Sequence, residues 1–127
     1  MPHILVAGTI HPSAVALLEA APGVSFSLVG EISETSYAPH MANADAVVIR
    51  TQPMSAATIA LAPNLKIVSR HGVGYDAVDV SALNARKIPL AIVGDVNSGS
   101  VAEHAMMLIL AASHRLVRAD QSVRTGN

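Results

Sequence analysis

The sequence predicts an α/β protein built on an open, doubly wound parallel sheet. Short apolar runs alternate along the chain with stretches that are compatible with helices. These runs are almost continuously apolar, which is typical of parallel strands that are covered on both faces. Pro- and Gly-containing pairs separate them, and such pairs mark turns. Right-handed crossovers between successive parallel strands favour the doubly wound arrangement.

The first apolar run, residues 4–7, is expected to form a buried strand. Pro12 and Ser13 then open an amphipathic helix through residue 21, which Pro22 and Gly23 stop. The remaining elements follow in order: strand 24–29, a weaker helix 31–43, strand 46–49, helix 55–61, strand 65–69, helix 80–86 and strand 90–93.

The last quarter of the chain is expected to be one long helix. Ser100 and Glu103 have the spacing of a capping box, and the helix could run over residues 100–124, with Gly126 as the stop. From residue 101 to 112 it is apolar nearly all round, so it needs cover on more than one side. We expect a homodimer through this helix or cover by a further domain. Burial of the helix within its own domain is the alternative.

Composition excludes several classes of function. Among 127 residues there are 8 Lys and Arg, 9 Asp and Glu, three aromatic residues and no Cys. This balance gives no basic or aromatic surface for nucleic acid and no thiol chemistry. The six His form no close ligand pair, so no metal is expected. The longest apolar stretch, 105–112, is too short for a bilayer, and no leader is recognised, so we expect a cytoplasmic protein without a membrane partner.

Candidate site residues follow the carboxyl ends of the predicted strands, where doubly wound sheets bind ligands. Gly72 and Gly74 could leave backbone N–H groups free to bind a small carboxylate. Arg50, followed by Thr51, and Arg70 are nearby cations, and guanidinium groups pair with carboxylate or phosphate. These residues predict an anion site; a structural turn with solvated arginines is the alternative.

The glycine turn also spells GxGxxA, the pattern of a dinucleotide fingerprint. Asp76 and Asp79 would place two carboxylates where the pyrophosphate should lie, so we interpret this motif as a decoy. Asn97 is either a turn or cap residue or an amide that faces the cleft. His71, beside the glycines, is a surface residue or a site residue.

Three segments together are similar to the NAD-dependent D-2-hydroxyacid dehydrogenases, and in particular to their D-3-phosphoglycerate dehydrogenase group. The segments are Arg50-Thr51, the run from Asn64 to Asp79, and the run from Asn97 to Glu103. Their order makes the combination specific, and the resemblance covers essentially the whole chain. It implies a flavodoxin-like substrate domain over residues 1–97, followed by an interdomain and dimerisation helix over 98–127.

The resemblance also implies roles for individual residues. The substrate would contact Arg50, Thr51, Asn97 and the turn Gly72-Val73-Gly74, and the cofactor NAD would contact Val73, Gly74 and Val101. The family's Rossmann domain, with its catalytic Arg, Glu and His, would lie beyond residue 127. No catalytic residue is therefore assigned here, and we expect the chain to be a truncated, inactive portion of such an enzyme.

Two functions remain open from the sequence. The first is the substrate-binding portion of an NAD-dependent oxidoreductase that acts on the CH–OH group of a D-2-hydroxy acid, such as 3-phosphoglycerate or a related small acid. The alternative is a stand-alone, non-catalytic module that binds an anion or dimerises.

Overall fold

A computed structural model describes residues 1–126 and divides the chain into two compact units. The first unit spans Met1–Gly94 and the second begins at Asp95. Each unit is described by itself below.

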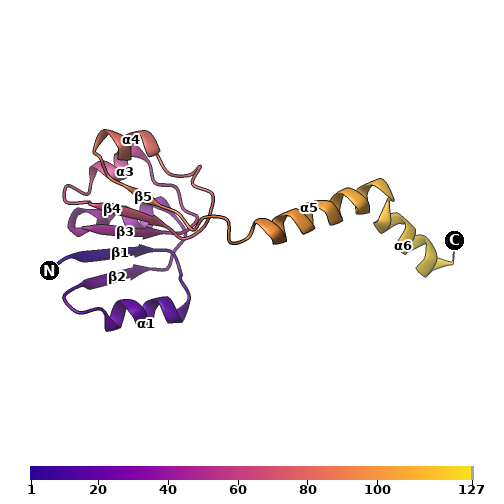
Figure 1. The fold of residues 1–127 in the computed structure, drawn as a ribbon, viewed down its shortest axis with the longest axis horizontal. Coiled ribbons are helices and arrows are strands. Elements are labelled where there is room, and N and C mark those ends of the chain that lie inside the picture. Colours follow the sequence, from indigo (N-terminus) through magenta and orange to yellow (C-terminus); the bar gives the residue numbers. More distant parts are fainter. Residues whose placement is uncertain (127) are drawn as a thin grey trace. The chain divides into compact units, whose positions relative to one another are not determined.

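The first unit is built on a five-stranded sheet within the described residues, and every strand pair is parallel. The strand order is β2-β1-β3-β4-β5, so the chain winds outward from β1 in both directions (Figure 1). This arrangement confirms the predicted fold class. The strands are β1 His3–Ala7, β2 Ser25–Val29, β3 Ala46–Ile49, β4 Ile67–Arg70 and β5 Leu90–Ala91.

The expected helices are present, with one change of type. The weaker helix expected over 31–43 is a short α-helix followed by a 3₁₀ helix, because Pro39 lacks the N–H that would continue the α-helical pattern. His11 caps the first helix, since its side chain accepts the Ser13 N–H. The helices are α1 Pro12–Ala20, α2 Glu34–Tyr37, η1 Ala38–Asn43, α3 Ala56–Ala60 and α4 Val80–Ala85.

The main core lies on one face of the sheet. Alternate strand residues such as Leu5, Val47 and Val68 are fully buried there. They pack with buried side chains from the helices and loops that follow β2, β3 and β4, which include Tyr37, Met41, Ile59 and Leu83. This packing fixes the strand ends from which the candidate site is built.

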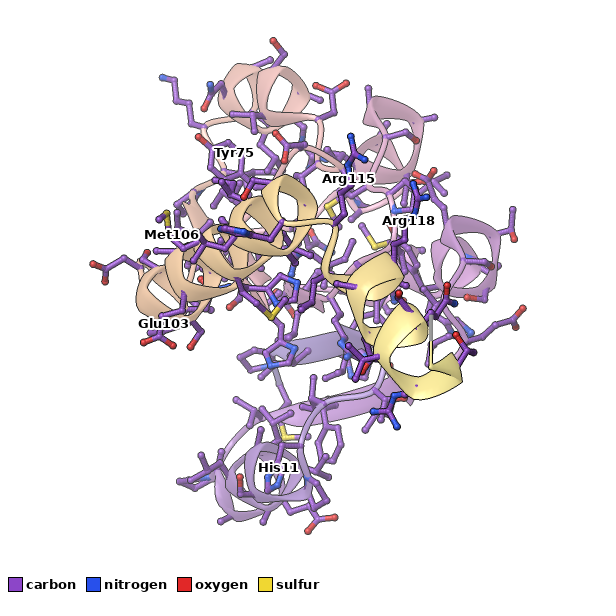
Figure 2. All side chains as sticks on the ribbon, turned by 90° about the vertical axis from the view of Figure 1, so that its right-hand side faces the viewer. His11, Tyr75, Glu103, Met106, Arg115 and Arg118 are labelled. Atoms are coloured by element: carbon purple, nitrogen blue, oxygen red, sulfur yellow. The ribbon has the colours of Figure 1, made fainter. Side chains whose placement is uncertain are left out.

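The second unit contains two helices within the described residues, α5 Ser98–Ser113 and α6 Leu116–Thr125. The expectation of one continuous helix over 100–124 is therefore wrong. Arg115, labelled in Figure 2, adopts a left-handed conformation (φ 50°, ψ 42°) that ends the helical path. The Ser113 hydroxyl also donates to the Leu110 carbonyl, which competes with the helix's own hydrogen bonding.

The apolar side chains of α5 are not covered within their own unit. No residue of α5 is buried in the described part of the chain, and Met106 and Ile109 are 56% and 59% exposed. Side chains project all round the helix in Figure 2, Glu103 and Met106 among them. Across residues 1–126, no helix is both long and apolar enough to cross a bilayer.

Candidate functional site

The candidate site is built on the carboxyl ends of three adjacent strands, β1, β3 and β4. The Arg50 N–H donates to the Ala7 carbonyl at 3.2 Å, which ties the end of β3 to the end of β1. The His71 N–H donates to the Ile49 carbonyl at 2.8 Å, which ties the end of β4 to the end of β3. The pairing of the strands therefore brings the Arg50–Thr51 segment next to the glycine turn.

A second tie joins the same two segments further along the chain. Met54 and Val78 form an isolated parallel bridge. In this bridge the Met54 N–H donates to the Ala77 carbonyl and the Asp79 N–H donates to the Met54 carbonyl, each at 2.9 Å. The segment of residues 50–54 and the turn of residues 71–79 are thus each held at both ends, which limits the conformations that they can adopt.

The glycine turn exposes fewer N–H groups than the sequence suggested. Gly72 has a φ of +149°, a backbone conformation that side chains rarely adopt, and its N–H donates to the Arg70 carbonyl at 2.8 Å. Within residues 1–126, the N–H groups of Val73 and Gly74 have no hydrogen-bond partner. The φ of position 74 is one that other residues adopt readily, and a Cβ there would make an ordinary 3.6 Å contact with Asp76. The donors available to a ligand are therefore those of Val73 and Gly74.

Arg70 and Arg50 supply positive charge beside this turn. The Arg70 guanidinium donates to the His71 carbonyl and occupies the space that a Cβ on Gly72 would need, with Cζ at 3.0 Å from that position. The Arg50 side chain is exposed. In the described part of the chain neither guanidinium pairs with a carboxylate, so both remain available to an anion.

Sequence reasoning missed two residues that support the loop after β3. The Tyr37 hydroxyl donates to the Pro53 carbonyl at 2.5 Å, and the Ser55 N–H donates to Glu34 Oε1 at 2.6 Å. Burial, aided by the Glu34 carboxylate, raises the pKa of Tyr37. Nothing in the local sequence around either residue signals these contacts, because each depends on how α2 packs.

The Glu34 carboxyl titrates below its ordinary range. Burial acts to raise its pKa, but hydrogen bonds from the side chains of Ser55 and Thr58 and from the Ser55 N–H outweigh burial and lower the pKa. Glu34 is therefore a carboxylate at neutral pH, as its role in accepting the Ser55 N–H requires.

Gln52 and Gly8 form a third support that sequence reasoning missed. Gln52 is 1% exposed, and its Oε1 accepts the Thr51 N–H at 2.9 Å. Gly8 has a φ of +97°, and a Cβ on it would lie 2.9 Å from Gln52 Nε2. The glycine that follows β1 could have indicated a close approach of another segment at this position. The sequence does not show that the approaching residue is Gln52.

Asn97 and Val101 belong to the second unit. Asn97 occupies the N-cap position of α5, but within the described residues its side chain makes no capping hydrogen bond. Val101 is 57% exposed. In the first unit, Val73 is partly buried and Gly74 is exposed.

The start of α4 does not resemble a pyrophosphate site. Asp79 is its N-cap, and Asp79 Oδ1 accepts the Ala82 N–H at 2.9 Å. A carboxylate thus already occupies the N terminus of this six-residue helix, which supports interpreting the GxGxxA pattern as a decoy. No group of three or more His, Asp or Glu side chains suited to a metal ion occurs within residues 1–126.

Comparison with known proteins relates the chain to dehydrogenases. The family model of the D-isomer specific 2-hydroxyacid dehydrogenase catalytic domain matches residues 4–122. The D-3-phosphoglycerate dehydrogenase of Mycobacterium leprae (strain TN) is 38% identical over 125 residues, which are 98% of this chain and 23% of that protein. A glyoxylate reductase of Thermofilum pendens (strain DSM 2475 / Hrk 5) is 38% identical over 76 residues, 60% of this chain and 22% of the relative.

Solved structures agree with these relatives. The NADPH-dependent glyoxylate/hydroxypyruvate reductase of Sinorhizobium meliloti, in complex with NADP and malonate, has a TM-score of 0.77 and 30% identity, covering 98% of this chain and 38% of the reductase. The NAD-dependent formate dehydrogenase of Staphylococcus aureus, in complex with NAD, has a TM-score of 0.80 and 25% identity, covering all of this chain and 43% of the other. This chain thus spans about a quarter of the M. leprae protein's length and well under half of either solved chain.

Proposed function

Because this chain belongs to the D-isomer specific 2-hydroxyacid dehydrogenase family, we propose that it forms the substrate-binding portion of an NAD-dependent oxidoreductase of small 2-hydroxy acids. One observation carries the proposal. The free N–H groups of Val73 and Gly74 lie on the same turn as the guanidinium of Arg70. Two backbone donors and a cation on a turn that is held at both ends match the needs of a carboxylate.

Each residue of the site has a proposed task. The N–H groups of Val73 and Gly74 hold the carboxylate of the acid, and Arg70 balances its charge. Arg50 and Thr51, on the adjacent strand end, contact the remainder of the substrate, and Arg50 suits a second anion such as a phosphate. Asn97 is also proposed to contact the substrate, on the strength of the family relationship. The substrate class is a D-2-hydroxy acid, either 3-phosphoglycerate or a related small acid.

The cofactor proposed for the whole enzyme is NAD, which supplies hydride transfer at the carbon that bears the hydroxyl group. Val73, Gly74 and Val101 are the residues of this chain proposed to contact it. These contacts offer backbone and apolar surface but no acid or base, so the chain's own part is to bind and orient the acid. We therefore expect residues 1–127 alone to transfer no hydride.

We further propose that the enzyme is a cytoplasmic homodimer and that α5 and α6, the segment expected to dimerise, contribute to its interface. Supporting this, apolar side chains all round α5 are exposed within their own unit, and such a surface is usually covered by a partner.

An NMR titration of the 127-residue chain tests the binding role. Oxalate, glyoxylate and D-3-phosphoglycerate should each shift the amide signals of Val73 and Gly74, with chloride at equal ionic strength as the control. Arg70→Gln should weaken that binding by about 10- to 100-fold, the range expected for a lost charge-assisted hydrogen bond. Shifts that leave residues 72–74 unaffected would contradict the proposal.

An activity assay separates this proposal from a complete enzyme. The chain is incubated with NADH and several 2-keto acids while absorbance is followed. Turnover would refute the inactivity of the chain by itself. We expect anion binding without turnover. The alternative of a stand-alone module is tested separately, by measuring whether the reading frame is translated beyond residue 127.

A further inference from the structure

Gln52 is the most deeply buried polar side chain near the candidate site, and one half of its amide is unsatisfied. Its exposed fraction is 1%, and within residues 1–126 its Nε2 has no hydrogen-bond partner. A buried donor without a partner carries a free-energy penalty. A Leu or Met of similar size would avoid that penalty, so core packing alone does not explain a Gln here.

The other half of the amide has a definite task. Gln52 Oε1 accepts the N–H of Thr51 at 2.9 Å. Thr51 itself is exposed, and it lies two residues after the end of β3. The side chain of Gln52 therefore folds back over its own backbone and fixes the orientation of the peptide between Arg50 and Thr51.

Gly8 provides the space that this arrangement needs. A Cβ on Gly8 would lie 2.9 Å from Gln52 Nε2, 3.2 Å from Gln52 Oε1 and 3.1 Å from the Cβ of Arg50. The bare backbone at the end of β1 thus contacts the Gln52 amide and the base of the Arg50 side chain together. The absence of a side chain on Gly8 therefore makes room both for the buried Gln52 amide and for the Cβ of Arg50, a proposed substrate contact.

We propose that Gln52 is a positioning residue, whose amide, seated on Gly8, fixes the Arg50–Thr51 peptide and so aims both residues at the substrate anion. The inference rests on the proposed function for the anion, but the hydrogen bond to Thr51 can be measured without any ligand. Gln52 does not touch the substrate itself, because its amide is buried.

Gln52→Met provides the direct test in the ¹⁵N-labelled chain. Met keeps the length of the side chain but removes both the acceptor for Thr51 and the unpaired donor. Thr51 amide exchange should become about tenfold faster, as expected when a single protecting hydrogen bond is lost. The melting temperature should stay the same or rise. The dissociation constant for oxalate should increase by about fivefold, since Arg50 and Thr51 lose their fixed orientation.

A pair of glycine variants provides the second test. Gly8→Ala adds a methyl group against Gln52, whereas Gly23→Ala also places alanine at a positive φ (+74°) but meets no atom within 4 Å. Both variants should lose stability through the backbone, but Gly8→Ala alone should speed Thr51 exchange and weaken oxalate binding. Equal effects of the two variants on Thr51 exchange would overturn the inference.

The outcomes separate the two proposals. If Thr51 exchange is the same in the wild type and in Gln52→Met, the positioning role is refuted whether or not oxalate binds. If the wild type shows no oxalate shifts at residues 73 and 74, the proposed function fails, while faster Thr51 exchange in Gln52→Met still supports the role of the amide in fixing the loop. If exchange changes but the oxalate affinity of Gln52→Met equals that of the wild type, the amide is structural only and the inference is overturned.

Discussion

Replacing Gly72 with alanine should damage both the stability of the turn and its affinity for an anion. Gly72 has a φ of +149°, where an L side chain is strained, and the new Cβ would overlap the Arg70 guanidinium. Strain of this kind costs about 1–3 kcal/mol. Arg70 can move because it is the far end of a flexible side chain, but it must then give up the His71 carbonyl.

These quantities set the expected sizes of the effects. A loss of about 1–3 kcal/mol in a chain of this length lowers the melting temperature by about 4–11 °C. Displacing the Arg70 guanidinium removes a charge-assisted contact worth about 1.5–3 kcal/mol, which corresponds to binding weaker by about 10- to 100-fold.

Thermal unfolding monitored by circular dichroism, together with the oxalate titration, checks both values. Gly74→Ala is the matched control for stability, because its φ is ordinary and its Cβ would meet Asp76 Oδ2 at 3.6 Å. That variant should melt within about 2 °C of the wild type. A Gly72→Ala protein that melts and binds oxalate like the wild type would show that neither the conformation nor Arg70 matters at this turn.

Three further predictions address other parts of the molecule. Arg50→Lys keeps the charge but loses the planar fork, so oxalate affinity should fall by about three- to tenfold in the NMR titration; unchanged affinity would remove Arg50 from the site. The pKa of Glu34 is depressed from 4.5 in the folded chain, so its contribution to stability is present above pH 4.5 and is lost as the pH falls through the folded value. Urea unfolding between pH 3 and 7 should therefore show a shallower acid loss for Glu34→Gln, and identical pH profiles would contradict the hydrogen bond to Ser55. Ile109→Asp, on the exposed apolar surface of α5, should convert a wild-type dimer to a monomer in sedimentation at micromolar concentration, and a monomeric wild type would contradict the proposed interface.

The strands were predictable because each contains a short run of apolar residues, and those of β1, β3 and β4 supply fully buried core side chains. Residues 46–49 match β3 at both ends, and the other runs match within two residues at each end. The helix after β2 was harder to predict, because Pro39 permits a helical turn while it blocks the α-helical hydrogen bond. The break at Arg115 could not be predicted, because an Arg in the left-handed conformation has no characteristic residue type. Gly126, by contrast, is a residue that commonly ends helices.

The candidate site was predictable only where residue type and strand position together identify a binding group. Arg50 and the glycine turn could be paired because parallel strands end at the same edge of a sheet. Which N–H groups remain free could not be predicted, because it depends on the bond between the Gly72 N–H and the Arg70 carbonyl. That bond uses the Gly72 N–H and leaves the N–H groups of Val73 and Gly74 without a partner among the described residues.

The supports of the loop after β3 show why sequence reasoning stopped short of them. Tyr37 and Glu34 reach this loop from α2, and Gly8 reaches it from the end of β1, so the contacts join residues 16 to 44 positions apart. Each support is a backbone group of the loop held by a distant side chain, or a missing side chain that makes room. Such contacts have no local periodicity and no motif, although they decide where Arg50 and Thr51 point. A substitution at any of these supports should therefore change ligand affinity although the substituted residue does not touch the ligand. The exchange rate of the Thr51 amide reports directly on the orientation of the loop, which a list of the residues that contact the ligand does not.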